Sequence, residues 1–345
     1  RFGNPVVDEW EGKVNAWPLD EGLIDYVDPG YSVASDQNPL HSANVIANPR
    51  LNVGARMIDA STITPDLLEN ELHQVGQIEA NVATGYHAIE FLLWGQDLNG
   101  TGPGAGARPW TDFAQDDRCT NDNCDRRAAY LRAATELLVS DLRWMAGEWE
   151  QGGSAREVVT GVAPDTGLAV MLTGLGSLSY GELAGERMKL ALLLNDPEEE
   201  QDCFSDNTHN SHYYNVVGME AIYLGRYLRA DGSVVAGPSL SALVAARAPA
   251  LDAEMRERLQ ASRAAMTALK ERAEAGERFD QMIAPGNSAG HAVVQAAIDA
   301  LTTQTRTIER IVAALELQPI EIEGSDSLDN PEAVFGSDDP AAVFQ

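Results

Sequence analysis

The stretch GYHAIEFLLWGQDLNG, residues 85–100, combines the apolar residues of a buried helix with two polar ones that such a helix does not require. Most of its first ten residues are small or apolar, and GQDLNG is typical of the turn that follows a helix end. His87 and Glu90 are three residues apart, so their side chains point to one side of the helix. This pair predicts either two ligands for one metal ion or substrate, or a hydrogen-bonded pair that only satisfies a buried histidine.

Helical periodicity extends outward from this stretch. Apolar residues recur at three- and four-residue steps over about residues 64–94, with Thr64 as N-cap and Pro65 at the first helical position. One continuous helix over that range would place Glu79 on the face of His87 and Glu90, with Tyr86 at its edge. Further helices are expected near residues 126–150, 166–194, 210–228, 249–275 and 287–316. Alternation with period two is rare, so we expect an all-α protein.

A weak internal similarity indicates two related helical bundles. GYHAIE at 85–90 aligns without gaps to GMEAIY at 218–223, with three identities in six, and both are expected to end long apolar helices. The glycine-containing segment EWEQGGSAREVV suggests a boundary near residue 152, giving domains 1–152 and 153–318. Residues 319–345 form an acidic tail, in which Phe335 and Phe344 either dock on the body or leave the tail mobile.

The charge of the chain restricts the classes of partner. Fifty-three acidic residues against 24 basic ones give a formal net charge of −29. Such a field repels nucleic acid and anionic membranes and concentrates cations, although solubility alone also explains an acidic surface. The chain begins at Arg1 and not at methionine, so we expect that an export signal, and with it any membrane anchor, preceded it.

The cysteines favour an oxidising compartment. Cys119 and Cys124 lie in the polar segment DRCTNDNCDRR, where a short-range disulfide would contribute about 2 kcal/mol. A metal site built on them is disfavoured because no second cysteine pair completes it, and Cys203 is left over. We therefore expect an exported protein.

A second polar cluster occupies residues 195–215, NDPEEEQDCFSDNTHNSHYYN. It contains carboxylates, imidazoles and phenols at Asp196, Glu198, Glu199, Glu200, Asp202, Asp206, His209, His212, Tyr213 and Tyr214. Together these groups suit iron, zinc, manganese or calcium. The alternative is a solvated acidic loop in which Asp206 or Asn207 caps the next helix.

A third feature is the set of charged residues in GELAGERMKLALLL. Glu182, Glu186 and Arg187 interrupt a helix of small and apolar residues. Arg187 is expected either to neutralise a buried carboxylate of the site or to form a plain structural salt bridge.

Read together, GYHAIE, GERM and DCFSDNTH, with NAWPLDEGLIDYV near the start, resemble the imelysin family and its iron-regulated protein A branch. The family hallmark Gly-x-His-x-x-Glu stands here as Gly85, His87 and Glu90. The resemblance implies two helical bundles with a site in the groove between them. It also implies either metallopeptidase activity or a role in periplasmic or outer-membrane iron uptake.

The preferred hypothesis is an exported metal-binding protein of iron acquisition, periplasmic or associated with the outer membrane. Iron is the favoured ion, with zinc or calcium as alternatives, and other iron-uptake components are the expected partners. Its predicted ligands are His87, Glu90, Asp202, Asp206 and His209, and Glu186 and Arg187 support them.

Two other functions stay open. One is a metallopeptidase in which Glu90 is the base on a metal-bound water, although the chain lacks the adjacent second histidine of helical zinc-peptidase motifs. The other is a site that binds a small organic ligand, metal chelate or peptide through His87 and Glu90. The metal site in particular requires His87 to converge with Asp202 and His209.

Overall fold

The computed structural model describes residues 2–30 and 40–336 and divides the chain into two compact units. The N-terminal unit comprises Pro5–Asn99 and Gly104–Ala155. The C-terminal unit comprises Arg1–Asn4, Gly100–Pro103 and Arg156–Gln345. Helices dominate both units, which confirms the all-α prediction, and the strands described form only two short hairpins.

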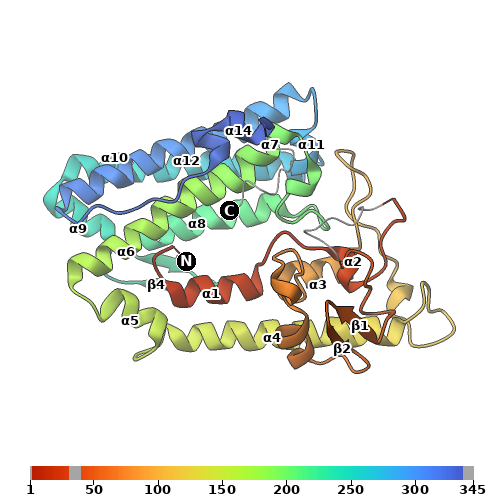
Figure 1. The fold of residues 1–345 in the computed structure, drawn as a ribbon. Helices are drawn as coiled ribbons and strands as arrows, with labels where there is room; N and C mark the ends of the chain where they lie inside the picture. The colour runs from red at the N-terminus through yellow and green to blue at the C-terminus, as the bar shows by residue number, and fades with distance from the viewer. Residues whose placement is uncertain (1, 31–39, 337–345) are drawn as a thin grey trace. The chain divides into compact units, whose positions relative to one another are not determined.

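The N-terminal unit is assembled from short helical pieces around one long helix, α4 (Figure 1). Its helical elements are α1 Pro5–Val14, α2 Glu21–Ile24, η1 Leu67–Leu72, η2 Val75–Gln77, α3 Gly85–Trp94, η3 Trp110–Phe113 and α4 Cys124–Glu148. Its hairpin pairs β1 Arg50–Val53 with β2 Arg56–Asp59, in antiparallel register. The α4 bounds agree closely with the helix expected at 126–150.

The prediction of a single helix over residues 64–94 is wrong. Its start is correct, because the Leu67 amide donates to Thr64 Oγ1 at 3.1 Å and helical structure begins at Pro65. The chain then leaves the helix at His73, and Gln74 and Gly76 adopt positive φ values of 52° and 77°. A regular helix resumes only at Gly85. GYHAIEFLLW is therefore a complete ten-residue helix and not the end of a long one.

The C-terminal unit is a bundle in which α10 packs against α12 and α8, and α12 also packs against η4 (Figure 1). Its helical elements are α5 Ser154–Thr160 (beginning in the N-terminal unit), α6 Pro164–Ser177, η4 Leu178–Lys189, α7 Leu190–Leu194, η5 Pro197–Glu199, α8 Thr208–Leu224, α9 Leu240–Arg247, α10 Pro249–Glu274, α11 Phe279–Ile283 and α12 Ser288–Ala314, then α13 Asp326–Asp329 and α14 Pro331–Gly336. The long helices of this unit agree well with their expected ranges.

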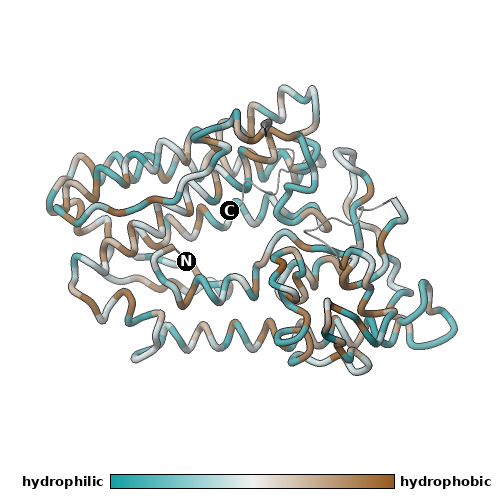
Figure 2. The backbone as a smooth tube through the Cα atoms, viewed as in Figure 1, coloured by the Kyte–Doolittle hydropathy of each residue, from teal (hydrophilic) through white to brown (hydrophobic). Residues whose placement is uncertain are grey.

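Amphipathic sequences explain how this bundle forms. In α12 the buried residues Val294, Ile298, Leu301, Ile308 and Ile311 recur at helical spacing. Figure 2 shows the resulting alternation of hydrophobic and hydrophilic residues along α10 and α12. These faces share one apolar core with residues of η4 and α8.

The helix expected at 210–228 ends earlier than predicted. Gly225 adopts a positive φ of 60° after α8, and Arg226–Leu228 then forms strand β3 of a hairpin with β4, Val234–Ala236. The β-branched and aromatic residues of RYL and VVA suit strands.

The segment that follows α12 packs against the bundle. The Glu323 amide donates to Ser177 Oγ at 3.0 Å, and Ser327 Oγ donates to the Gly185 carbonyl at 3.0 Å. The Tyr180 hydroxyl donates to Asp329 at 2.6 Å. Phe344 and the side chain of Phe335 lie outside the described residues.

No single described helix has both the length and the apolar composition of a membrane span. One bent pair, Ser154–Thr160 with Pro164–Leu194, satisfies both criteria when its parts are taken together.

Candidate functional site

His87 and Glu90 lie side by side in the N-terminal unit, on the inner face of α3. The His87 side chain is 1% exposed and that of Glu90 is 11% exposed. His87 Nδ1 lies 3.3 Å from Glu90 Oε2, and Nε2 lies 3.2 Å from Asn15 Oδ1. The ring of Trp17 packs edge-on against the imidazole, with centroids 5.0 Å apart. The imidazole is therefore held at both nitrogens and on one side.

The position of this helix depends on the glycine of the motif. Gly85 has a φ of +84°, and a Cβ there would lie 2.5 Å from the Val14 carbonyl oxygen. Only glycine allows the start of α3 to approach the end of α1 so closely. Thr84 Oγ1 reinforces the junction by donating to the Lys13 carbonyl at 2.8 Å. This junction places Asn15 beside His87.

The spacing of the pair fits metal chelation as well as a hydrogen bond. Metal bonds of about 2.1 Å from both His87 Nδ1 and Glu90 Oε2 would leave these atoms at an N–metal–O angle of roughly 100°. That angle lies near the tetrahedral and octahedral values. A bound ion would replace the direct contact between Nδ1 and Glu90 Oε2.

The other two residues expected on this face are not part of it. Glu79 lies in a turn outside α3 and is exposed, because the chain is not helical there. Tyr86 points to solvent and is 47% exposed.

The loop that precedes α8 brings Asp206 to two other carboxylates. Asp206, Glu200 and Asp280 are buried, and one oxygen of each lies within 4.8 Å of the others. Asp202 is held nearby by its amide, which donates to Thr208 Oγ1 at 2.8 Å. The sequence analysis did not select Asp280, which lies in ERFDQM with no neighbouring motif to mark it.

The two histidines of α8 have different surroundings. His209 is 3% exposed, and its Nε2 accepts from Asn210 Nδ2 at 3.1 Å and faces Arg278 Nη1 at 3.5 Å. Burial, together with the charges of Arg278 and Lys270, lowers the pKa of His209. His212 is fully buried against Phe279, and burial lowers its pKa to about 3. Both imidazoles are therefore neutral at physiological pH, as metal ligation by His209 would require.

Arg187 pairs with Glu182 and not with Glu186. Its Nε donates to Glu182 Oε1 at 2.9 Å, and both side chains are largely buried. The five-residue separation matches the wide i→i+5 turns of η4. Burial raises the pKa of Glu186 above its ordinary value, and a hydrogen bond from Ser325 offsets only part of that rise. Arg187 thus forms a salt bridge with Glu182, and its supporting role at a metal site stays a prediction.

The predicted disulfide is confirmed. Cys119 and Cys124 form a disulfide, and Cys203 is buried and not part of it. The disulfide adjoins Asp112, which accepts from Thr120 Oγ1 at 2.7 Å and from Asn121 Nδ2 at 2.9 Å.

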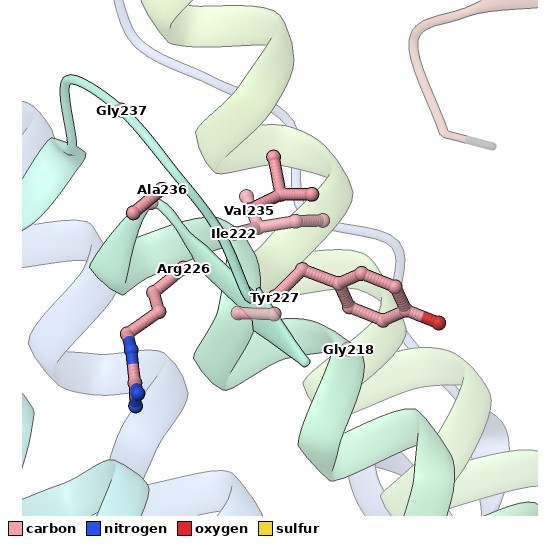
Figure 3. A pocket seen from close by; sticks show the side chains of 9 residues that line it. Gly218, Ile222, Arg226, Tyr227, Val235, Ala236 and Gly237 are labelled. Carbon is pink, nitrogen blue, oxygen red and sulfur yellow. The ribbon is translucent and has the colours of Figure 1, made fainter. Parts of the chain in front are cut away.

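A separate hollow of about 450 Å³ lies between the end of α8 and the β3–β4 hairpin. Its lining is mostly small and apolar: Gly218, Ala221, Ile222, Gly225, Arg226, Tyr227, Val235, Ala236 and Gly237. Figure 3 shows the side chains of Arg226 and Tyr227 pointing in opposite directions. The hollow therefore offers no converging polar groups for catalysis or metal binding.

The predicted ligands thus belong to two units, with His87 and Glu90 in one and Asp202, Asp206 and His209 in the other. The structure defines each set within its own unit. Their convergence stays a prediction.

Comparisons with known proteins support the family resemblance. Residues 1–308 match the family described as Imelysin. No curated protein matches the chain. A solved structure from Parabacteroides distasonis, named an iron-regulated protein A precursor, is similar with a TM-score of 0.56 and 16% identity. The similarity covers 90% of this chain and 77% of that one. Because the family match spans most of the sequence, this chain belongs to the imelysin family.

Proposed function

We propose that this imelysin-family protein is an exported metal-binding protein of iron acquisition, in which His87 and Glu90 bind the ion directly. The observation that carries the proposal is the buried pair of His87 Nδ1 and Glu90 Oε2, 3.3 Å apart on one turn of α3. Family membership and the name of the Parabacteroides protein favour iron as the ion.

Two atoms are too few for a stable site, so further ligands are required. Asp202 and His209 are the predicted ones from the C-terminal unit. Asp206 lies with Glu200 and Asp280, and its role as a ligand beside His87 stays a prediction. Imidazole and carboxylate together suit Fe²⁺ and Zn²⁺ better than Ca²⁺, which prefers oxygen ligands alone.

Metal titration of the metal-free protein tests the proposal. Calorimetry with Fe²⁺ under anaerobic conditions, and with Zn²⁺, should show binding that His87→Ala and Glu90→Gln each weaken by more than about 100-fold. Affinity should rise with pH, because protons compete with a metal ion for imidazole and carboxylate ligands. Glu79→Gln is the matched control, since Glu79 is an exposed carboxylate six residues from Gly85 and should leave affinity unchanged.

Two results would overturn this assignment. Unchanged affinity in both His87→Ala and Glu90→Gln would remove the pair from the site. Chelator-sensitive cleavage of unfolded polypeptides, lost in Glu90→Gln, would instead establish the metallopeptidase, with Glu90 as the base on a metal-bound water.

A further inference from the structure

Three buried carboxylates converge inside the C-terminal unit. Glu200 follows η5, Asp206 lies just before α8, and Asp280 is the second residue of α11. They are 1%, 4% and 1% exposed, respectively. One oxygen of each lies within 4.8 Å of the others.

The surrounding structure holds these groups in place. Thr208 links the loop to Glu200, because its hydroxyl donates to the Glu200 carboxylate while its oxygen accepts from the Asp202 amide at 2.8 Å. Asp206 adopts a positive φ of 53°. Asp280 is flanked by Phe279 and Met282, which are fully buried. Asp280 is thus set between buried apolar side chains of α11.

Glu200 is the member whose charge is least compensated. Its Oε1 atom is buried and has no hydrogen-bond partner in the described part of the chain, and the described residues form no ion pair with it. Burial, followed by the charges of Asp280, Asp206 and Asp202, raises its pKa well above the ordinary value.

Three basic side chains on nearby elements are directed to other partners. Arg278, next to α11, faces His209 at 3.5 Å. Lys270 on α10 pairs with Glu274, and Arg187 on η4 pairs with Glu182. Glu200, buried beside two other carboxylates, therefore requires either a bound proton or a bound cation.

We propose that Glu200, Asp206 and Asp280 bind one hard divalent cation of the calcium type, which ties the loop before α8 to α11. Carboxylate oxygens without sulfur or nitrogen are the ligands of Ca²⁺, Mg²⁺ and Mn²⁺. One oxygen of each carboxylate lies within 4.8 Å of the others, so all three can face one ion, and Ca–O bonds of about 2.4 Å accommodate a wider set of oxygens than Mg–O bonds of about 2.1 Å. This site is independent of the one proposed at His87.

The test is calcium binding to the full chain after removal of metals. Calorimetry with CaCl₂ should show one site, and Ca²⁺ should raise the thermal midpoint more than Mg²⁺ does at equal concentration. Glu200→Gln and Asp280→Asn should each weaken Ca²⁺ binding at least tenfold. Glu198→Gln changes an exposed carboxylate in the same loop and should leave binding unchanged.

The comparison with His87→Ala separates the two proposals. That variant should keep the Ca²⁺ response while losing affinity for Fe²⁺ or Zn²⁺. If wild-type protein shows neither heat nor a shift in midpoint with millimolar Ca²⁺, the proposal is overturned. Wild-type protein alone decides this outcome, so it does not depend on whether Glu200→Gln folds. A rise in metal-free stability on Glu200→Gln would then identify a shared proton instead.

Discussion

Two groups of buried carboxylates, one in each unit, are stabilised in opposite ways. In the N-terminal unit, Asp25 and Asp112 are 1% and 0% exposed and are bound by arginines. Arg127 Nε donates to Asp25 at 2.6 Å, and Arg108 Nη1 contacts Asp25 at 2.7 Å and Asp112 at 3.2 Å. In the C-terminal unit, Glu200 lies beside other carboxylates and forms no ion pair with the described residues.

This difference appears in the direction of the pKa shifts. Burial alone would raise the pKa of Asp112, but hydrogen bonds from Tyr26, Thr120 and Asn121 and the charge of Arg127 lower it. For Glu200, burial and neighbouring carboxylates act together and raise the pKa. A carboxylate with its own cation is stable inside a protein, whereas one without must find a proton or an ion.

The largest expected effect on stability comes from removing Arg127, a buried arginine of the N-terminal unit. Arg127→Ala leaves Asp25 buried with Arg108 alone, and should lower the free energy of unfolding by about 3–5 kcal/mol. Urea unfolding followed by tryptophan fluorescence measures this unit, because all six tryptophans lie between residues 10 and 149.

Arg118→Ala is the control for that variant. Arg118 pairs with Asp116 at 2.7 Å on the surface, so its loss should not change stability measurably. An equal effect of the two substitutions would mean that burial does not distinguish the ion pairs.

The second comparison is between the aligned glycines of GYHAIE and GMEAIY. Gly85→Ala should destabilise by about 2–3 kcal/mol, because its φ is positive and the new Cβ would meet the Val14 backbone. Gly218→Ala should stabilise by up to about 1 kcal/mol, since Gly218 lies within α8 with nothing within 4 Å of the added Cβ. Thermal unfolding of both variants measures the contrast, and equal destabilisation would support equivalent positions in a repeat.

The third prediction concerns the loop that supplies Thr120 and Asn121 to Asp112. Replacing Cys119 and Cys124 together by serine should cost about 2 kcal/mol, as expected for a short closed loop. Reduction of the wild-type protein should have the same effect, again measured by tryptophan fluorescence. No loss of stability would show that the loop holds its shape without the crosslink.

The last prediction concerns the pH dependence of stability in metal-free protein. The raised pKa of Glu200 means that the folded state keeps a proton that the unfolded state releases above about pH 4.5. The raised pKa of Glu199, about 7 through burial and the charges of Asp196, Glu186 and Glu198, acts in the same direction. These groups should lower stability as pH rises from about 4.5 to 7.

Asp112 acts in the opposite direction, because its lowered pKa contributes stability that is lost only as the pH falls below about 4. Thermal unfolding by circular dichroism between pH 4.5 and 7 measures the net slope. Glu200→Gln should flatten that slope, and an unchanged slope would contradict the assignment of the proton to Glu200.

Local patterns were sufficient to predict the long helices. α4, α10 and α12 begin and end within a few residues of their expected ranges, because their apolar faces and capping residues are close in sequence. The error at 64–94 arose because the apolar period continues through residues 73–84, where positive φ values at Gln74 and Gly76 interrupt the helix. Glu79 was misplaced for the same reason.

In the candidate site too, contacts between residues close in sequence were predicted, and contacts between distant residues were missed. His87 and Glu90 were predicted to be adjacent, and they are, since one helical turn connects them. Asp280 was missed because 74 residues separate it from Asp206, and nothing around it signals the contact. Asp25 and Arg127, 102 residues apart, were missed in the same way.

What the amino-acid order dictated, then, was the helical class, the disulfide and the pairing of His87 with Glu90, because each depends on residues that neighbour one another along the chain. Which buried carboxylates receive an arginine and which share a pocket was decided by folding. That outcome depends on contacts between distant segments, whose desolvation and charge have no local signature in the sequence.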